Sequence, residues 1–245
     1  MERPGELGAM PTDWRRGLVV VAHPDDIEYG AAAAVAAWTA AGRDLRYVLA
    51  TRGEAGIAGL APAESGPLRE AEQRASAAVV GVTDVEFLDH PDGRLESGLR
   101  LRRDVAAALR RHRPELVVTL NHRDVFAPRH WNSSDHRILG RTVLDAVADA
   151  ANEWIFPELA DAGFAPWDGV RWVAAAASPE PTHSVDVTGF TDLAVESLSA
   201  HRRYLEALSS LPVAEQARGQ IDAVTRDPRD PDGPRTVAFE LFPSG

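Results

Sequence analysis

A histidine and two aspartates follow an apolar run near the N-terminus. The run at residues 18–22 leads into His23, Asp25 and Asp26, and Pro24 restricts the turn between them. Imidazole nitrogen and carboxylate oxygen are both good zinc ligands, so His23 and Asp26 could bind one cation across this turn. Asp25 would then be free to take a proton from water. A solvated loop with the same residues is the other interpretation, and this stretch alone leaves both open.

The segments on either side of this turn predict a strand followed by a helix. Residues 18–22 are β-branched and apolar on both faces, which suits a strand buried in a parallel sheet. Residues 31–41 are rich in strong helix formers. The turn would therefore lie at the carboxyl end of a strand and beside a helix N-terminus, where open α/β sheets bind their ligands.

The rest of the chain alternates between short apolar runs and helical patterns. Further strands are predicted at 45–50, 85–88, 116–120 and 172–176, and helices at 69–80, 99–112, 136–150 and 191–208. This alternation predicts an α/β fold, a Rossmann-like three-layer sandwich with a mostly parallel sheet. We expect a single domain over residues 1–245, with a core over about 17–210 and a C-terminal extension, 211–245, that includes an edge strand at 236–242.

Composition limits the kind of protein. The net charge of -11 argues against a general nucleic-acid binder, which needs a basic surface. With no cysteines, any zinc must be held by histidines and carboxylates. The chain has no apolar run long enough to span a membrane and no signal-peptide pattern, so we expect a cytoplasmic enzyme. A homo-oligomer is compatible with all of these features.

Two glycine-containing loops follow predicted strands at the same sheet edge. Residues 51–56 read Thr-Arg-Gly-Glu-Ala-Gly, and their glycines would allow the backbone to approach a ligand closely. Residues 91–93 read Pro-Asp-Gly, which is also an ordinary turn signal. Each loop can be either a connector or part of a site.

Three histidines follow the strand predicted at 116–120. His122, His130 and His136 lie on one loop at the same edge as His23, so one or more of them could complete a metal site. Ser134 and Asp135 are candidate N-caps for the next helix.

Taken in order, these motifs resemble those of the LmbE-like, or PIG-L, deacetylases. The motifs are Ala-His-Pro-Asp-Asp with a following glutamate at 22–28, Thr-x-Gly-Glu-x-Gly at 51–56, Arg-Glu-Ala-Glu at 69–72, Pro-Asp-Gly at 91–93 and Asp-His at 135–136. Members of this family are Rossmann-like, zinc-dependent hydrolases that remove acetyl from N-acetylglucosaminyl groups of small molecules. The resemblance implies the same fold and activity here.

The resemblance also implies a metal site and a base. His23 and Asp26 match the first two zinc ligands, His136 matches the third, and Asp25 matches the general base. Amide hydrolysis by water activated at zinc is the implied reaction. Two histidines and one carboxylate also describe non-haem iron sites, so Fe²⁺ is the alternative metal.

Substrate contacts follow from the same resemblance. Arg69 and Asp92 match positions that contact sugar hydroxyls in the family. The implied partner is a small N-acetylated amino-sugar conjugate. The sequence does not identify its acyl group or its aglycone.

One motif departs from the family pattern. The family usually has His-x-Asp-His, in which the first histidine is a general acid paired with the aspartate. In this chain the aspartate is Asp135, and Ser133 stands in the place of that first histidine. Serine cannot protonate a leaving amine near neutral pH. His130 is the leading substitute, followed by His122 or a proton returned by Asp25. The alternative is a catalytically weak or inactive homologue with a sugar-binding or regulatory role.

Overall fold

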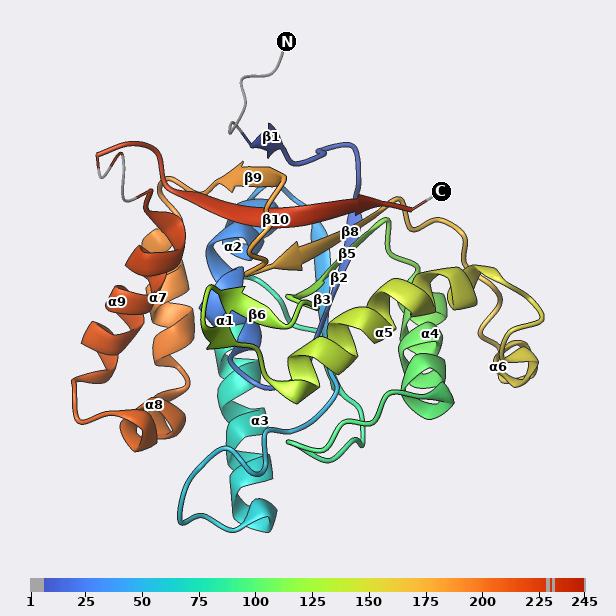
Figure 1. The fold of residues 1–245 in the computed structure, drawn as a ribbon, viewed down its shortest axis with the longest axis horizontal. Helices are drawn as coiled ribbons and strands as arrows, with labels where there is room; N and C mark the ends of the chain where they lie inside the picture. The colour runs from blue at the N-terminus through green and yellow to red at the C-terminus, as the bar shows by residue number, and fades with distance from the viewer. Residues whose placement is uncertain (1–6, 228–229, 231, 245) are drawn as a thin grey trace.

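A central eight-stranded sheet organises the chain in this computed structural model, which describes residues 7–227, 230 and 232–244 (Figure 1). Its strands are β1 (Gly8–Ala9), β2 (Arg16–Val21), β3 (Asp44–Leu49), β4 (Val85–Phe87), β5 (Leu116–Leu120), β8 (Trp172–Ala176), β9 (His183–Asp186) and β10 (Thr236–Pro243). Their order is β1-β9-β10-β8-β5-β2-β3-β4. The pairs from β8 to β4 are parallel, and β10 runs antiparallel to both of its neighbours.

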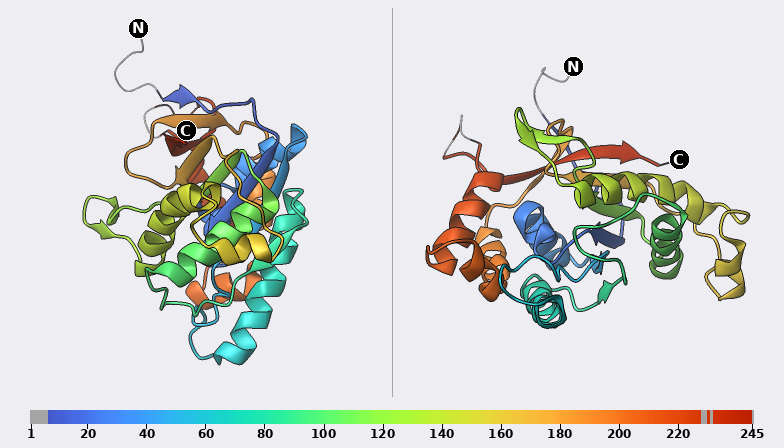
Figure 2. Two further views of the ribbon diagram at one scale, coloured as in Figure 1. Left: turned by 90° about the vertical axis from the view of Figure 1, so that its right-hand side faces the viewer. Right: turned by 60° about the horizontal axis from the view of Figure 1, so that its bottom comes forward.

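Helices cover both faces of the sheet. They are α1 (Asp26–Gly30), α2 (Ala32–Ala40), α3 (Pro62–Val79), α4 (Leu99–His112), α5 (Ser134–Ala151), α6 (Pro157–Asp161), α7 (Thr191–Ser199), α8 (Arg202–Leu208) and α9 (Val213–Thr225). In the right-hand view of Figure 2, the green and yellow α4 to α6 stand apart from the orange and red α7 to α9. This mixed α/β fold with a mostly parallel sheet confirms the predicted fold class.

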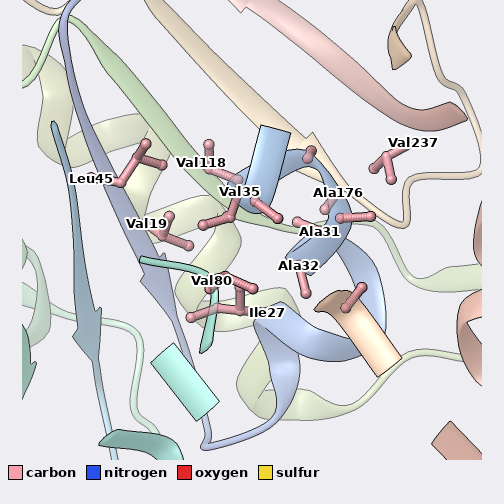
Figure 3. Close-up of a cluster of buried hydrophobic side chains, with 14 of the residues drawn as sticks. Val19, Ile27, Ala31, Ala32, Val35, Leu45, Val80, Val118, Ala176 and Val237 are labelled. Carbon is pink, nitrogen blue, oxygen red and sulfur yellow. The ribbon is translucent and has the colours of Figure 1, made fainter. Parts of the chain in front are cut away.

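Alternation along the strands divides the apolar side chains between two cores. In β2, Val19 and Val21 face the core under α2, α3 and α7, whereas Leu18 and Val20 face the core under α4 and α5. Figure 3 shows the first core, where side chains of neighbouring strands meet those of the helices. Full burial of one such side chain contributes about 1.5–3 kcal/mol, so β2, apolar on both faces, is a natural centre for the sheet.

The order of the strands places a crevice at the carboxyl end of β2. The chain passes from β2 to β3 and β4 in one direction, and then returns to place β5 on the other side of β2. Connections that leave neighbouring parallel strands in opposite directions open a crevice in which α/β proteins bind ligands. The loops after β2 and β5 both enter this crevice.

The segment at 236–242 is not the edge strand that the sequence predicted. β10 pairs with β8 on one side and with β9 on the other, so it lies inside the sheet. Its Glu240 is buried because Arg123 and Ser178 donate hydrogen bonds to the carboxylate. The sequence shows the charge of Glu240 but not the partners that make it tolerable inside the sheet.

Some of the predicted element boundaries are confirmed, and others differ from the structure. The strands at 116–120 and 172–176 and the helix at 99–112 are confirmed. The helix expected from 69 begins at Pro62 and continues through Pro67. The helix expected at 191–208 is broken around the buried His201 into α7 and α8.

Two features complete the fold. A small hairpin, β6 (Val125–Ala127) with β7 (His130–Trp131), was not predicted and follows β5. Within the described residues, no helix has both the length and the apolar character needed to cross a membrane.

Candidate metal centre and active site

The turn after β2 is held in an uncommon backbone conformation. Asp25 has φ of 85°, in the left-handed region, which costs about 1–3 kcal/mol for a residue other than glycine. Gln73 of α3 supports it by accepting a hydrogen bond from the Asp25 backbone N–H at 2.9 Å. Oδ2 of Asp26 accepts from the backbone N–H groups of Ala22 and His23, at 3.0 and 2.7 Å. The turn thereby presents both carboxylates to the crevice.

The three predicted metal ligands lie together. His136 Nε2 is 3.0 Å from Asp26 Oδ1, and His23 Nδ1 is 3.5 Å from Asp26 Oδ2. One ligand atom from each residue lies within 4.8 Å of the others. His136 Nδ1 is 3.2 Å from Oδ1 of the fully buried Asn132, a contact that orients the ring. The two imidazoles and one carboxylate fit a divalent ion such as zinc.

Electrostatics favour the metal-binding form of Asp26. Burial alone would raise the pKa of its carboxyl, but His136 and His23 hold that pKa well below its usual range. Asp26 is therefore ionised near neutral pH, as a metal ligand must be.

Asp25 differs from Asp26 although both are buried. Burial raises the pKa of Asp25 to about 7, against the opposing charge of Arg69. Arg69 Nη2 donates to Asp25 Oδ1 at 3.0 Å and to the Pro24 carbonyl at 2.6 Å, and Nη1 donates to the Gly53 carbonyl at 3.1 Å. A carboxyl with this pKa can both take and return a proton near neutral pH.

The glycines at 53 and 56 make room for Arg69. A Cβ at Gly53 or at Gly56 would collide with Arg69 Nη1, and Gly53 also has φ of 62°. Arg69 is only 2% exposed, so its guanidinium is part of the wall of the site. The sequence indicated that these glycines let a ligand approach; in the structure they accommodate this arginine.

Two further carboxylates contact His23. His23 Nε2 lies 3.1 Å from Asp92 Oδ1 and 3.2 Å from Asp135 Oδ2. The backbone N–H of Ala55 donates to Asp92 at 2.8 Å, and that of Gly93 donates to Asp135 at 2.8 Å. His23, Asp92 and Asp135 form a second group whose ligand atoms lie within 4.8 Å. Asp135 therefore joins α5 to the loop at 91–93 and to the first metal-ligand candidate.

Ser133 has the helix-capping role that the sequence predicted for Ser134 and Asp135. Its Oγ accepts a hydrogen bond from the His136 N–H at 3.1 Å, so Ser133 is the N-cap of α5. Ser134 and Asp135, the predicted caps, lie inside the helix. Ser133 also lines the cavity described below.

The structure does not bring the other two histidines into the site. His130 is exposed on β7, with Nδ1 3.2 Å from the Pro128 carbonyl. His122 is half-buried, with its ring 5.5 Å from that of Phe242, and burial lowers its pKa. Neither is among the described residues that line the cavity, so this structure gives no support to the predicted role of either one as the acid.

A cavity of about 980 Å³ opens at the candidate metal centre. Six of the eight predicted catalytic, metal-binding and substrate-binding residues line it: His23, Asp25, Asp26, Arg69, Asp92 and His136. Three aromatic residues, Tyr29, Phe126 and Tyr204, also line it and were missed. The Tyr204 ring lies 4.0 Å from the Arg69 guanidinium carbon, and the Phe126 ring lies 6.0 Å from that of His136. Tyr29 stands inside the first motif, whereas no pattern pointed to Phe126 or Tyr204.

Comparison with known proteins matches this site to one family. The model of PIG-L, described as GlcNAc-PI de-N-acetylase, matches residues 18–147, just over half of the chain. The matched stretch contains all three candidate metal ligands and Asp25.

Individual relatives agree with this match. The diacetylchitobiose deacetylase of Thermococcus kodakarensis is 25% identical over 191 residues, which cover 77% of this chain and 70% of that protein. The probable N-acetyl-alpha-D-glucosaminyl L-malate deacetylase 2 of Bacillus anthracis is 31% identical over 141 residues, 55% of this chain and 60% of that protein.

A solved structure extends the likeness to the whole fold. The N,N'-diacetylchitobiose deacetylase from Pyrococcus horikoshii, complexed with its inhibitor MPG, superposes with a TM-score of 0.83 at 22% identity. The superposition covers 95% of this chain and 85% of that one. It includes the segment beyond residue 147, where the family model does not match.

Proposed function

Because this chain belongs to the PIG-L family, we propose that it is a zinc-dependent deacetylase that hydrolyses the amide of a small N-acetylglucosaminyl conjugate. The observation that carries the proposal is the convergence of His23, Asp26 and His136 in one cavity, with Asp25 beside them. The relatives, named as deacetylases of N-acetylated sugars, support the substrate class.

We assign metal binding to His23, Asp26 and His136. Zinc in such a site supplies a Lewis acid and lowers the pKa of water towards ~7. Asn132 contributes by orienting the His136 ring, and the backbone N–H groups of the turn orient Asp26. Iron(II) suits the same donor set and is the alternative.

We assign proton transfer to Asp25. In the hydrolysis, a water oxygen forms a bond to the acetyl carbon, the carbon–nitrogen bond breaks, and the nitrogen needs a proton to leave as an amine. Among the three carboxyls that line the described cavity, Asp25 has the raised pKa, about 7, whereas the pKa values of Asp26 and Asp92 are lowered. Asp25 is therefore suited to take the water's proton and to deliver it to the nitrogen.

We assign different roles to the two predicted substrate contacts. Asp92 lines the cavity beside His23 and is the candidate for binding sugar hydroxyls. Arg69 already donates to the carbonyls of Pro24 and Gly53 and to Asp25, so its main contribution is to hold the base in place.

One observation favours a second function. Ser133 stands where the family usually has its acid, and its hydroxyl already caps α5. A homologue that binds an amino sugar without hydrolysing it would fit this change. The retained Asp25, whose backbone and side chain are both held by buried groups, favours the hydrolase.

An amine-release assay tests the proposal. The protein is stripped of metal, reloaded with zinc or with iron(II) under anaerobic conditions, and assayed against N-acetylglucosamine, its inositol and malate conjugates, and diacetylchitobiose. We expect metal-dependent release of free amine, slowed about 10²–10⁴-fold in an Asp25→Asn variant that has the same metal content. Binding of these sugars without amine release under any metal would support the second function instead.

A further inference from the structure

One side of the cavity is apolar and is built by the C-terminal part of the chain. The apolar wall consists of Leu208 at the end of α8, Ala223 and Val224 of α9, and Val237 and Ala238 of β10. All five residues lie beyond residue 147, where the match to the family model ends. The motifs shared with the family therefore do not account for this wall.

The apolar wall has a fixed position relative to the catalytic turn. Gln220 of α9 donates from Nε2 to the carbonyl of Tyr29 in α1, at 3.0 Å. Helix α9 packs against both α1 and β10, and in Figure 1 it lies on the side of α1 away from α4. One cavity thus joins the candidate metal centre to the apolar wall.

Two of the polar side chains that line the cavity beside the apolar wall have protein partners. Gln220 binds the Tyr29 carbonyl, and Ser178 Oγ donates to Glu240 Oε2 at 2.6 Å. A sugar hydroxyl placed against the five apolar side chains of the wall would lose hydrogen bonds to water without replacing them there, which is unfavourable. The wall is suited to an apolar group.

This region is large enough and exposed enough to accept part of a ligand. The cavity of about 980 Å³ is at the upper end of the range of roughly 300–1,000 Å³ that is typical of small-molecule pockets. An N-acetylated monosaccharide would leave part of it empty. Leu208 is 52% exposed at this side and Ala223 is also exposed, so this part of the apolar wall is accessible to a ligand.

We propose that the substrate carries an apolar chain of several carbons, which lies on the apolar wall while its amide lies at the candidate metal centre. This inference rests on the proposed function and adds a substrate class to it. The chain can be a group on the anomeric carbon of the N-acetylated sugar or a longer acyl group in place of the acetyl, because both would bury methylene groups on the wall. Each methylene fully removed from water strengthens binding about fourfold.

Binding measurements on the zinc-loaded Asp25→Asn variant test this inference, because that variant is designed not to consume the amide. One series is N-acetyl-, N-butanoyl- and N-hexanoyl-glucosamine, and the other is methyl, butyl and hexyl N-acetylglucosaminide, each titrated calorimetrically. We expect affinity to rise with chain length in at least one series, approaching about fourfold per methylene. The responding series identifies the source of the chain. Affinities independent of length in both series would overturn the inference.

A pair of variants on one helix locates the effect. Ala223→Trp fills the space at the apolar wall, whereas Ala214→Trp adds the same side chain at an exposed position of α9 outside the cavity. In the Asp25→Asn background, we expect Ala223→Trp to abolish the dependence on chain length and Ala214→Trp to preserve it. A dependence that survives Ala223→Trp would overturn the placement of the chain.

The two proposals fail in different ways. Absence of amine release from every substrate would overturn the deacetylase function, while the binding series would still decide the inference. Amine release with flat affinities would overturn the inference alone.

Discussion

The turn after β2 and the loop after β5 both reach the candidate metal centre, but only the turn is enclosed by protein. Asp25 and Asp26 are 6% and 7% exposed, and α3 supplies Gln73 and Arg69 beneath them. In the loop, buried Asn132 donates to the backbone at the base, while the tip, residues 126–131, is largely exposed.

This difference separates two parts of the proposed chemistry. The enclosed turn holds His23, Asp25 and Asp26, to which we assign metal binding and proton transfer, and contacts with the protein set their geometry before any substrate arrives. The exposed loop lies where the family places the acid for the leaving amine, and it offers Ser133 instead of histidine. The comparison predicts that substitutions in or beneath the turn have large effects, whereas substitutions at the tip of the loop have small ones.

The largest effect is expected from Asp25→Asn. The substitution keeps the shape of the side chain and an acceptor for Arg69, but removes the group that takes the proton. We expect kcat to fall about 10²–10⁴-fold, with metal content within the error of the parent. Steady-state kinetics and elemental analysis check this. Asp26→Asn is the control, because it should lose metal as well; equal metal loss in both variants would contradict the assigned roles.

A stability effect is expected beneath the turn, where Glu28 is fully buried. Its carboxylate accepts from Gln73 at 3.0 Å and Ser76 at 2.7 Å, and lies 3.4 Å from His201 Nε2, an ion-pair distance without hydrogen-bond alignment. Removing one partner of a buried pair costs about 3–5 kcal/mol. We expect His201→Leu to lower the free energy of unfolding near pH 6 by about this amount, measured with urea.

The pH dependence of stability follows from the same pair. Burial alone would raise the pKa of Glu28, but His201 and Ser76 lower that pKa below its ordinary value of 4.5. Burial alone would lower the pKa of His201, but Glu28 raises that pKa above its ordinary value of 6.5. The stability that ionised Glu28 contributes is lost as pH falls below 4.5, and the stability that protonated His201 contributes is lost as pH rises above 6.5. Metal-free parent should therefore lose stability above pH 6.5 more steeply than His201→Leu. Parallel profiles would show that the pair is not charged.

The effect of metal on stability tests whether one ion binds both the turn after β2 and the loop after β5. A ligand bound to the folded state at 100 times its Kd stabilises that state by about 2.7 kcal/mol. A chelator should lower the melting temperature of the parent, and His136→Ala should show little of this shift. His122→Ala is the matched control, since the structure places His122 outside the cavity. A chelator shift that persists in His136→Ala and disappears in His122→Ala would exchange their roles.

The elements and residues that are marked by patterns among near neighbours in the sequence were predicted correctly. β8 is apolar along its whole length, β5 is apolar except for Thr119, and α4 shows a regular apolar face, so their bounds were found from the sequence. His23 and Asp26 stand in one short motif, whose residue types allow a metal site and whose resemblance to the family pattern predicts one.

Features that depend on distant partners could not be predicted. Gln73 supports Asp25 across 48 residues of chain, and Tyr204 reaches the site from α8, with no local pattern to mark either. The interior position of β10 depends on Arg123 and Ser178 as partners of Glu240. Long-range contacts of this kind follow from the order of the strands, which periodicity does not give.

The smallest effect is expected at the tip of the exposed loop. His130 would cost about 10²–10⁴-fold in kcat if it were the acid, but it lies outside the cavity with its Nδ1 near the Pro128 carbonyl. We expect His130→Ala to leave kcat within about threefold of the parent and the pH profile unchanged, because a group outside the cavity does not contact the leaving amine. A large fall in kcat with KM unchanged would instead make His130 the acid and require the loop to close over the substrate.

Ser133→His sharpens this test from the other direction. It supplies a titratable group at the cavity wall but removes the cap of α5, which costs about 1 kcal/mol, so Ser133→Ala is measured beside it as the control for the lost cap. If Asp25 delivers the proton in the parent, the two variants should show equal kcat once the difference in folded fraction is corrected. A higher kcat in Ser133→His than in Ser133→Ala, with a new limb in the pH profile, would show that the exposed half of the site limits the reaction through its missing acid.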